Sequence, residues 1–275
     1  MFVKFWLKTL ITRYSPLDTA QMRAWRQLQD PNYQHERDKH PVRNKHHAKG
    51  GWKSHAESGI LYRDYADYEE YLNHQKAKWS EMLTIKGGLG QKELYDYRLR
   101  FFRRFRMLPG LLKPEARILC MGARQGTEVE VLRDLGFPNA QGIDLNPGPE
   151  NPFVRKGDFM HLEEADRSLD MVYSNCVDHA FDLDAYFREH ARALKEDGFA
   201  IYDLSLGEGQ TSTGGPFEAV NWGRDELVLQ MLLKYFRSVF KVEREPGWMW
   251  MVLHGTHNEA QMTTKNAEQA QSSHK

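Results

Sequence analysis

The sequence predicts an α/β fold with a parallel sheet at its centre. An apolar run, Ile118–Met121, ends at two glycines four positions apart, Gly122 and Gly126, and an apolar pattern with the period of a helix continues to Leu135. A second short apolar stretch follows and ends in Asp144. The order strand, tight turn, helix, strand and acid is typical of folds that bring the backbone against a nucleotide-like ligand.

The residues of the glycine turn favour one ligand class. A phosphate-binding P-loop has a Lys-Ser/Thr pair after its last glycine, whereas Thr127 and Glu128 follow Gly126 here. A dinucleotide site needs a middle glycine for the pyrophosphate, and Arg124 stands in that position. Glu128 would repel phosphate but attract an ammonium group, and Asp144 can accept hydrogen bonds from ribose hydroxyls. S-adenosylmethionine has a ribose, a cationic methionine end and no phosphate, so it fits best.

Over residues 111–256 the chain resembles the class I S-adenosylmethionine-dependent methyltransferases. The matching segments, in family order, are MGARQG (residues 121–126), GIDLNP (142–147), KGDF (156–159), SLDMVYSNCVDH (168–179) and HARALKEDGFAIYDL (190–204). The family usually has an acid where Cys120 stands and a glycine where Arg124 stands, and a methyltransferase-like subset with a G-A-R-x-G first motif matches better. The resemblance implies a Rossmann-like seven-stranded methyltransferase sheet with helices on both faces, preceded by a mostly helical N-terminal extension.

The resemblance also implies which residues contact the cofactor. Asp144 would bind the ribose, Asp158 would approach the adenine amino group, and Glu128 would carry the amino-acid contact. The complete expected set is Gly122, Ala123, Arg124, Gly126, Glu128, Asp144, Leu145, Asp158, Phe159 and Asn175. For Asp158 a plain turn is the alternative, because Gly-Asp pairs commonly form turns.

Two residues just beyond the predicted fourth strand are the catalytic candidates. Transfer to a hydroxyl often needs a base, and His179 could take a proton near neutral pH, with Asp178 orienting its ring or contacting substrate. The alternative is that Asp178 caps the next helix and that His179 has no chemical role.

Composition restricts the partners and the compartment. Among the 275 residues, Lys+Arg and Asp+Glu are balanced at 38 each, so no overall field favours polyanions. The two cysteines, Cys120 and Cys176, are expected to be buried free thiols, which indicates a cytoplasmic protein. No apolar run is long enough to span a bilayer. Residues 1–12 read as a helix docked on its own domain or as an interfacial helix with weak membrane-surface contact.

The chain divides into a mostly helical extension with a basic His-rich loop (residues 1–110), a methyltransferase domain (111–257) and a disordered polar tail (258–275). The expected elements are a helix beginning at Ser15, a loop over 32–58, helices over 65–83, 92–112 and 224–240, and two strands within 241–254. The histidines of residues 35–55 lack the spacing of a metal site, so no metal is predicted.

These observations together predict an S-adenosylmethionine-dependent methyltransferase. The sequence SNCVD (residues 174–178) lacks the paired prolines that shape a flipped-base pocket in DNA enzymes. A small hydroxylated acceptor, such as a saccharide or secondary metabolite, is therefore preferred, with O-methylation as the reaction. The N-terminal segment and the loop 206–220 are expected to cover the acceptor pocket. The alternatives are an RNA-modifying enzyme anchored through residues 35–55 and a non-catalytic binding protein with the same fold.

Overall fold

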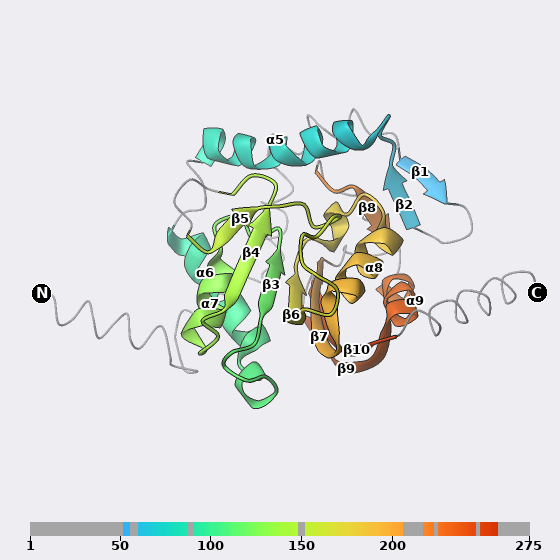
Figure 1. The fold of residues 1–275 in the computed structure, drawn as a ribbon. Helices are drawn as coiled ribbons and strands as arrows, with labels where there is room; N and C mark the ends of the chain where they lie inside the picture. Colours follow the sequence, from blue (N-terminus) through green and yellow to red (C-terminus); the bar gives the residue numbers. More distant parts are fainter. Residues whose placement is uncertain are drawn as a thin grey trace, which may run out of the picture.

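The computed structural model describes residues 52–55, 60–86, 91–147, 152–205, 217–222, 225–245 and 248–257. A seven-stranded sheet in the order β5-β4-β3-β6-β7-β10-β9 forms its centre (Figure 1). The strands are β3 (Ile118–Met121), β4 (Ala140–Asp144), β5 (Val154–Lys156), β6 (Leu169–Ser174), β7 (Leu194–Ser205), β9 (Phe236–Glu245) and β10 (Trp248–Thr256). Strands β3 to β7 are parallel, and β10 runs antiparallel to both of its neighbours. The predicted seven-stranded sheet is confirmed.

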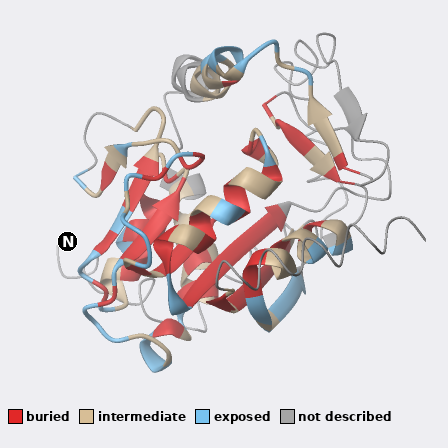
Figure 2. Cartoon of the chain, turned by 45° about the vertical axis from the view of Figure 1, so that its right-hand side comes forward, coloured by how far each residue is buried: buried red, intermediate tan, exposed pale blue. Residues whose placement is uncertain are grey.

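Helices cover both faces of this sheet, as predicted. They are α6 (Gln91–Phe105) and α7 (Thr127–Asp134) on one face and α8 (Leu183–Ala193) and α9 (Asp225–Tyr235) on the other. Because side chains alternate along a strand, Ile118 and Cys120 pack with α6 and α7, whereas Leu119 and Met121 pack with α8 and α9. Figure 2 shows the resulting buried centre between the two helical layers. The continuous apolar run of β3 therefore belongs to a strand buried on both faces.

The two cysteines fit this core as expected. Cys120 and Cys176 are both buried free thiols, so that prediction is confirmed.

A further helix and a small sheet lie outside the seven-stranded sheet. Helix α5 (Tyr68–Lys86) crosses above the ends to which β3 and β4 point (Figure 1). Strands β1 (Trp52–His55), β2 (Ile60–Arg63) and β8 (Val220–Trp222) form an antiparallel sheet in the order β1-β2-β8. The pairing of β2 with β8 joins the chain before the central sheet to the segment that follows β7.

Helix boundaries differ from the sequence predictions for local reasons. The Asp67 carboxylate accepts a hydrogen bond from the Glu70 backbone N–H at 2.8 Å, so α5 begins at Tyr68. The helix expected over 92–112 ends at Phe105, and Pro109 then lies in a short 3₁₀ turn, since proline cannot continue an α-helix.

Two other predictions are wrong over part of their length. The helix expected over 224–240 ends at Tyr235, because residues from Phe236 onward pair with β10 and extend the sheet. Within the loop expected over 32–58, Trp52–His55 forms β1, which obtains its hydrogen bonds from β2. The N-terminal extension is therefore not helical throughout.

Several expectations lie outside the described residues. These are the segment 1–12, the helix from Ser15, most of the basic His-rich segment, most of the loop 206–220 and the tail 258–275. The domain division at residue 110 remains a prediction.

Candidate functional site

The glycine turn after β3 has the backbone conformation that its residues suggest. Gly122 and Gly126 have φ of 63° and 71°, in the left-handed region that favours glycine. A Cβ on Gly122 would lie 2.7 Å from Cys176 Sγ, so a larger residue would also collide with the chain beyond β6. Arg124, with φ of 44°, is one of the few non-glycine residues in this region. Glycine would adopt this backbone conformation without strain.

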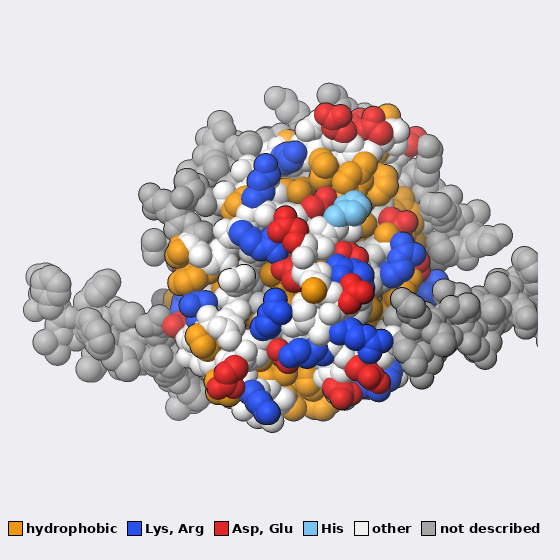
Figure 3. Space-filling model, in the orientation of Figure 1, with side chains coloured by type: hydrophobic (Ala, Val, Ile, Leu, Met, Phe, Trp, Pro, Cys, Tyr) orange, Lys and Arg blue, Asp and Glu red, His pale blue; other side chains and the backbone are white. Residues whose placement is uncertain are grey.

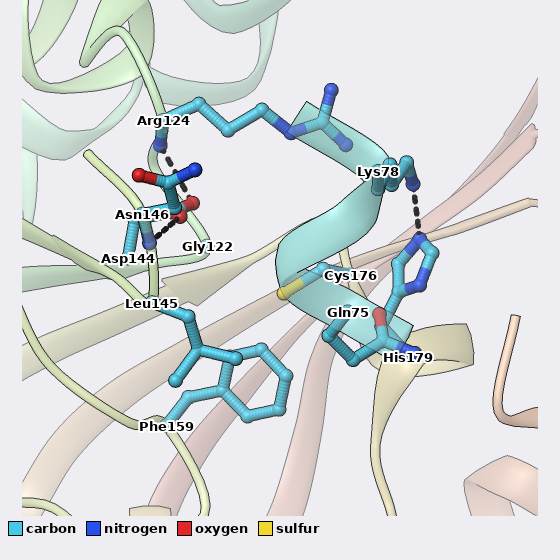
Figure 4. Close-up of a pocket in the computed structure, with 10 residues that line it drawn as sticks. All are labelled: Gln75, Lys78, Gly122, Arg124, Asp144, Leu145, Asn146, Phe159, Cys176 and His179. Atoms are coloured by element: carbon cyan, nitrogen blue, oxygen red, sulfur yellow. Dashed lines mark hydrogen bonds between the residues drawn. The ribbon is translucent and has the colours of Figure 1, made fainter. Parts of the chain in front are cut away.

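Asp144, the last residue of β4, is fixed against this turn. Its carboxylate accepts hydrogen bonds from the Arg124 backbone N–H at 3.0 Å and from the Asn146 backbone N–H at 2.8 Å (Figure 4). Each carboxylate oxygen has two lone pairs, so both oxygens retain accepting capacity. The arrangement suits the hydroxyls of a ribose.

A pocket opens at the carboxyl ends of the parallel strands, where ligands of open α/β sheets bind. It encloses about 480 Å³, including space open to solvent, and is lined by Gln75, Lys78, Gly122, Arg124, Asp144, Leu145, Asn146, Phe159, Cys176 and His179. The predicted site residues that line it are Gly122, Arg124, Asp144, Leu145, Phe159 and His179. The predicted site residues that are not part of the lining are Ala123, Gly126, Glu128, Asp158, Asn175 and Asp178.

Sequence reasoning missed the contribution of α5. Gln75 and Lys78 are three positions apart, on one side of this helix, and both line the pocket (Figure 4). The Gln75 side-chain amide donates to the Phe217 carbonyl at 2.9 Å. The helical pattern was visible in the sequence, but nothing in it indicated that α5 crosses the pocket.

His179 is held by hydrogen bonds at both ring nitrogens. Nδ1 lies 2.9 Å from the Phe217 carbonyl oxygen, and Nε2 lies 2.6 Å from Lys78 Nζ. Burial, with the positive charges of Lys78 and Arg124, holds the pKa of His179 well below its usual range. The ring is therefore neutral near neutral pH in the unliganded fold. Its catalytic role remains a prediction.

Asp178 lies beside the same ring. One of its carboxylate oxygens is 3.8 Å from His179 Nε2. Burial and the negative charge of Glu218 raise the pKa of Asp178. The alternative role of Asp178 as a helix cap is not seen, because Asp182 caps α8 by accepting from two backbone N–H groups.

Two predicted cofactor residues have neighbours that bear on their roles. Asp158 accepts hydrogen bonds from the Tyr68 hydroxyl at 2.6 Å and from the Met160 backbone N–H at 2.9 Å. Glu128 is buried in the first turn of α7, and burial raises its pKa to about 8. The contacts predicted for Asp158 with adenine and for Glu128 with an ammonium group remain predictions.

Comparison with known proteins agrees with this geometry. Residues 119–202 match the methyltransferase domain family. The fold is Rossmann-like and similar to that of a solved S-adenosylhomocysteine-bound methyltransferase. The matched domain implies S-adenosylmethionine as the cofactor. A search of curated proteins found no match.

Solved structures from three organisms resemble this fold. The 1,6-didemethyltoxoflavin N1-methyltransferase of Burkholderia thailandensis, bound to S-adenosylhomocysteine, is 16% identical, with a TM-score of 0.56 over 72% of this chain and 95% of that one. A phosphoethanolamine N-methyltransferase of Haemonchus contortus, also with S-adenosylhomocysteine, is 15% identical, with a TM-score of 0.51 over 72% of this chain and 62% of that one. The PH0226 protein of Pyrococcus horikoshii is 17% identical, with a TM-score of 0.50 over 66% and 99% of the two chains. At these identities the likeness concerns the fold.

Within the described residues, no helix is long and apolar enough to cross a membrane. The same residues contain no group of three or more His, Cys, Asp or Glu side chains arranged to hold a metal ion. On the face shown in Figure 3, basic and acidic side chains are intermixed.

Proposed function

We propose that this chain is an S-adenosylmethionine-dependent methyltransferase of the G-A-R-x-G subset that O-methylates a small hydroxylated acceptor, such as a saccharide or secondary metabolite. The observation that carries the proposal is Asp144, held by two backbone N–H groups at the mouth of the glycine turn. A carboxylate fixed there suits a ribose, and the methyltransferase domain match covers the strands on both sides of it.

Different predicted site residues contact different parts of the cofactor. Asp144 binds the ribose hydroxyls, while Leu145 and Phe159, which lie together on one side of the pocket, contact the adenine ring (Figure 4). Gly122 lets the methionine part approach the backbone, and Glu128, which is protonated at neutral pH in the unliganded fold, ionises on cofactor binding to pair with the ammonium group. When bound, S-adenosylmethionine supplies a methyl group that is electrophilic because it is carried on a sulfonium sulfur. Buried free thiols support a cytoplasmic location.

Calorimetry with S-adenosylmethionine and S-adenosylhomocysteine tests the cofactor. We expect binding in the micromolar range, about −8 kcal/mol. Asp144→Asn should weaken it about tenfold or more, because charge-assisted hydrogen bonds to the ribose are lost. Asp170→Asn is the matched control, since Asp170 also accepts a backbone N–H bond, from Arg117, but at the opposite ends of the strands. Unchanged affinity in a folded Asp144→Asn variant would remove the ribose assignment.

A product assay identifies the acceptor. Transfer of a radiolabelled methyl group from S-adenosylmethionine is measured with phenols, saccharides, amines and RNA in parallel. Transfer to RNA that falls steeply with salt would favour the RNA-modifying alternative, because phosphate contacts release counterions. Cofactor binding without transfer to any class would favour a binding protein.

A further inference from the structure

The wall of the pocket that α5 forms contains a lysine, Lys78, that the sequence did not indicate as a site residue. Lys78 reaches the pocket from α5 and ends beside His179, which follows β6 (Figure 4). Few lysines are placed in this way, because an ammonium group that loses water must find acceptors in the protein.

The hydrogen bonds of His179 define what Lys78 can do. A carbonyl oxygen only accepts, so the contact with Phe217 places the ring proton on Nδ1. Nε2 then presents a lone pair and accepts a hydrogen bond from Lys78 Nζ at 2.6 Å. This bond is possible for a charged or a neutral amine, since both carry N–H groups. When Lys78 is neutral, one of its N–H groups still donates to His179 Nε2, and the lone pair of Lys78 Nζ is available to the pocket.

We propose that Lys78 is the catalytic base of this site and that His179 is the positioning residue that orients its amine. The inference deepens the proposed methyl transfer and rests on it. The sequence suggested His179 as the base. Here His179 only accepts a hydrogen bond from Lys78, and Lys78 takes the proton from the acceptor.

The step balances without any further reactant. The acceptor hydroxyl gives its proton to Lys78 Nζ, which becomes an ammonium group. The acceptor oxygen forms the new bond to the methyl carbon, and the electron pair of the broken carbon–sulfur bond stays on sulfur. The ammonium group then returns its proton to water.

The electrostatic surroundings support a lysine that is neutral part of the time. Burial and the positive charge of Arg124 lower the pKa of Lys78, while nearby anions oppose that shift. The charged and titratable groups that act on it are Arg124 from the glycine turn, Asp178 and Cys176 from the segment after β6, and Glu218 from the segment before β8. Desolvation is the largest influence and lowers the pKa of Lys78 to about 8, so a fraction of the amine is neutral near neutral pH and that fraction grows as pH rises.

Competitive acetylation measures this property without any acceptor. The folded protein is treated with trace acetic anhydride from pH 6 to pH 11, and mass spectrometry gives the rate at each lysine. Lys78 should react with a midpoint well below the ordinary lysine value of about 10.4. Lys76, on the same helix but absent from the pocket lining, is the matched control. S-adenosylhomocysteine should slow acetylation of Lys78 and leave Lys76 unchanged.

Substitutions then show whether Lys78 acts as a base or only as a fixed positive charge. Lys78→Met and Lys78→Arg should both lower methyl transfer about 100-fold or more, to whichever of the phenols, saccharides or amines the unmodified protein uses, with S-adenosylhomocysteine affinity nearly unchanged. His179→Leu should lower kcat without a comparable change in KM. The kcat of His179→Gln should be much closer to that of the unmodified protein, because the glutamine amide oxygen can accept a hydrogen bond from Lys78.

Each outcome decides the inference. Lys78 titrating like Lys76, or Lys78→Arg retaining full transfer, would overturn the role of Lys78 as base while leaving cofactor binding intact. Failure of the unmodified protein to bind S-adenosylhomocysteine would instead overturn the proposed function, and acetylation would still show whether Lys78 has the unusual amine.

Discussion

At the scale of single residues, Glu128 couples stability to pH. Its folded pKa of about 8 lies above the ordinary glutamate value of about 4.3. Between these values the folded protein retains a proton that the unfolded chain has released, so the free energy of unfolding falls as pH rises through this window. Glu128→Gln should remove that slope and stabilise the protein by about 2–4 kcal/mol at pH 8. Urea denaturation from pH 5 to pH 9 measures both effects.

Glu130→Gln provides the control, because Glu130 is two positions along α7 and pairs with Arg98 at the surface. It should change stability by about 1 kcal/mol or less. A Glu128→Gln variant with the same pH slope as the unmodified protein would show that this carboxyl is charged in the fold.

The residues of the cofactor pocket were predictable to different degrees. Gly122 and Asp144 could be predicted because a turn with positive φ and an acid at a strand end leave a local pattern in sequence. Lys78 could not, because its importance comes from a contact with His179 that is 101 positions away. The depressed pKa of His179 likewise depends on burial that no local pattern reveals.

At the scale of elements, a buried ion pair joins α6 to the sheet. Arg104 of α6 and Asp203 of β7 are both fully buried, with Arg104 Nε 3.1 Å from a carboxylate oxygen of Asp203. The Arg104 guanidinium also lies over the ring of Trp250, 5.1 Å from its centroid. Arg104→Met should destabilise the fold by about 3–5 kcal/mol, because Asp203 would be left buried and charged. Urea denaturation measures the loss.

Arg106→Met is the matched control, since Arg106 is exposed just beyond α6, and its effect should be small. The double variant Arg104→Met/Asp203→Leu should be more stable than Arg104→Met alone, because no unpaired charge remains. Equal stability of the single variant and the unmodified protein would show that the pair contributes nothing net.

Element prediction succeeded where local and long-range preferences agree. The strand Ile118–Met121 was predicted because a short apolar run bounded by glycine permits few other structures. The strand that begins at Phe236 was missed because its residues also fit a helical pattern, and only pairing with β10 decides between the two. Strand β1 was missed because Lys53, Ser54 and His55 are polar and the strand obtains its hydrogen bonds from β2.

At the scale of the whole molecule, α5 connects the two sides of the pocket. Tyr68 bonds to Asp158 after β5, Tyr71 donates to the His179 carbonyl at 3.0 Å, and Lys78 bonds to the His179 ring. Adding S-adenosylhomocysteine should therefore slow amide hydrogen exchange in residues 68–78 together with residues 122–126. Mass spectrometry of peptides measures the protection.

Strand β9 is the internal control, because it lies at the far edge of the sheet. Its exchange should stay the same. Protection confined to residues 122–126 would show that α5 does not respond to the cofactor.

The pairing of β2 with β8 has a consequence for engineering of the chain. The Arg63 backbone N–H donates to the Ala219 carbonyl at 2.8 Å, and Ile60 is aligned with Trp222. Two stretches of chain separated by most of the central sheet thus form one hydrogen-bonded unit. A chimaera that takes only the stretch with β2, or only the stretch with β8, from another protein would pair two strands that did not come from the same chain. A chimaera that exchanges both stretches together should therefore be more stable than one that exchanges either stretch alone.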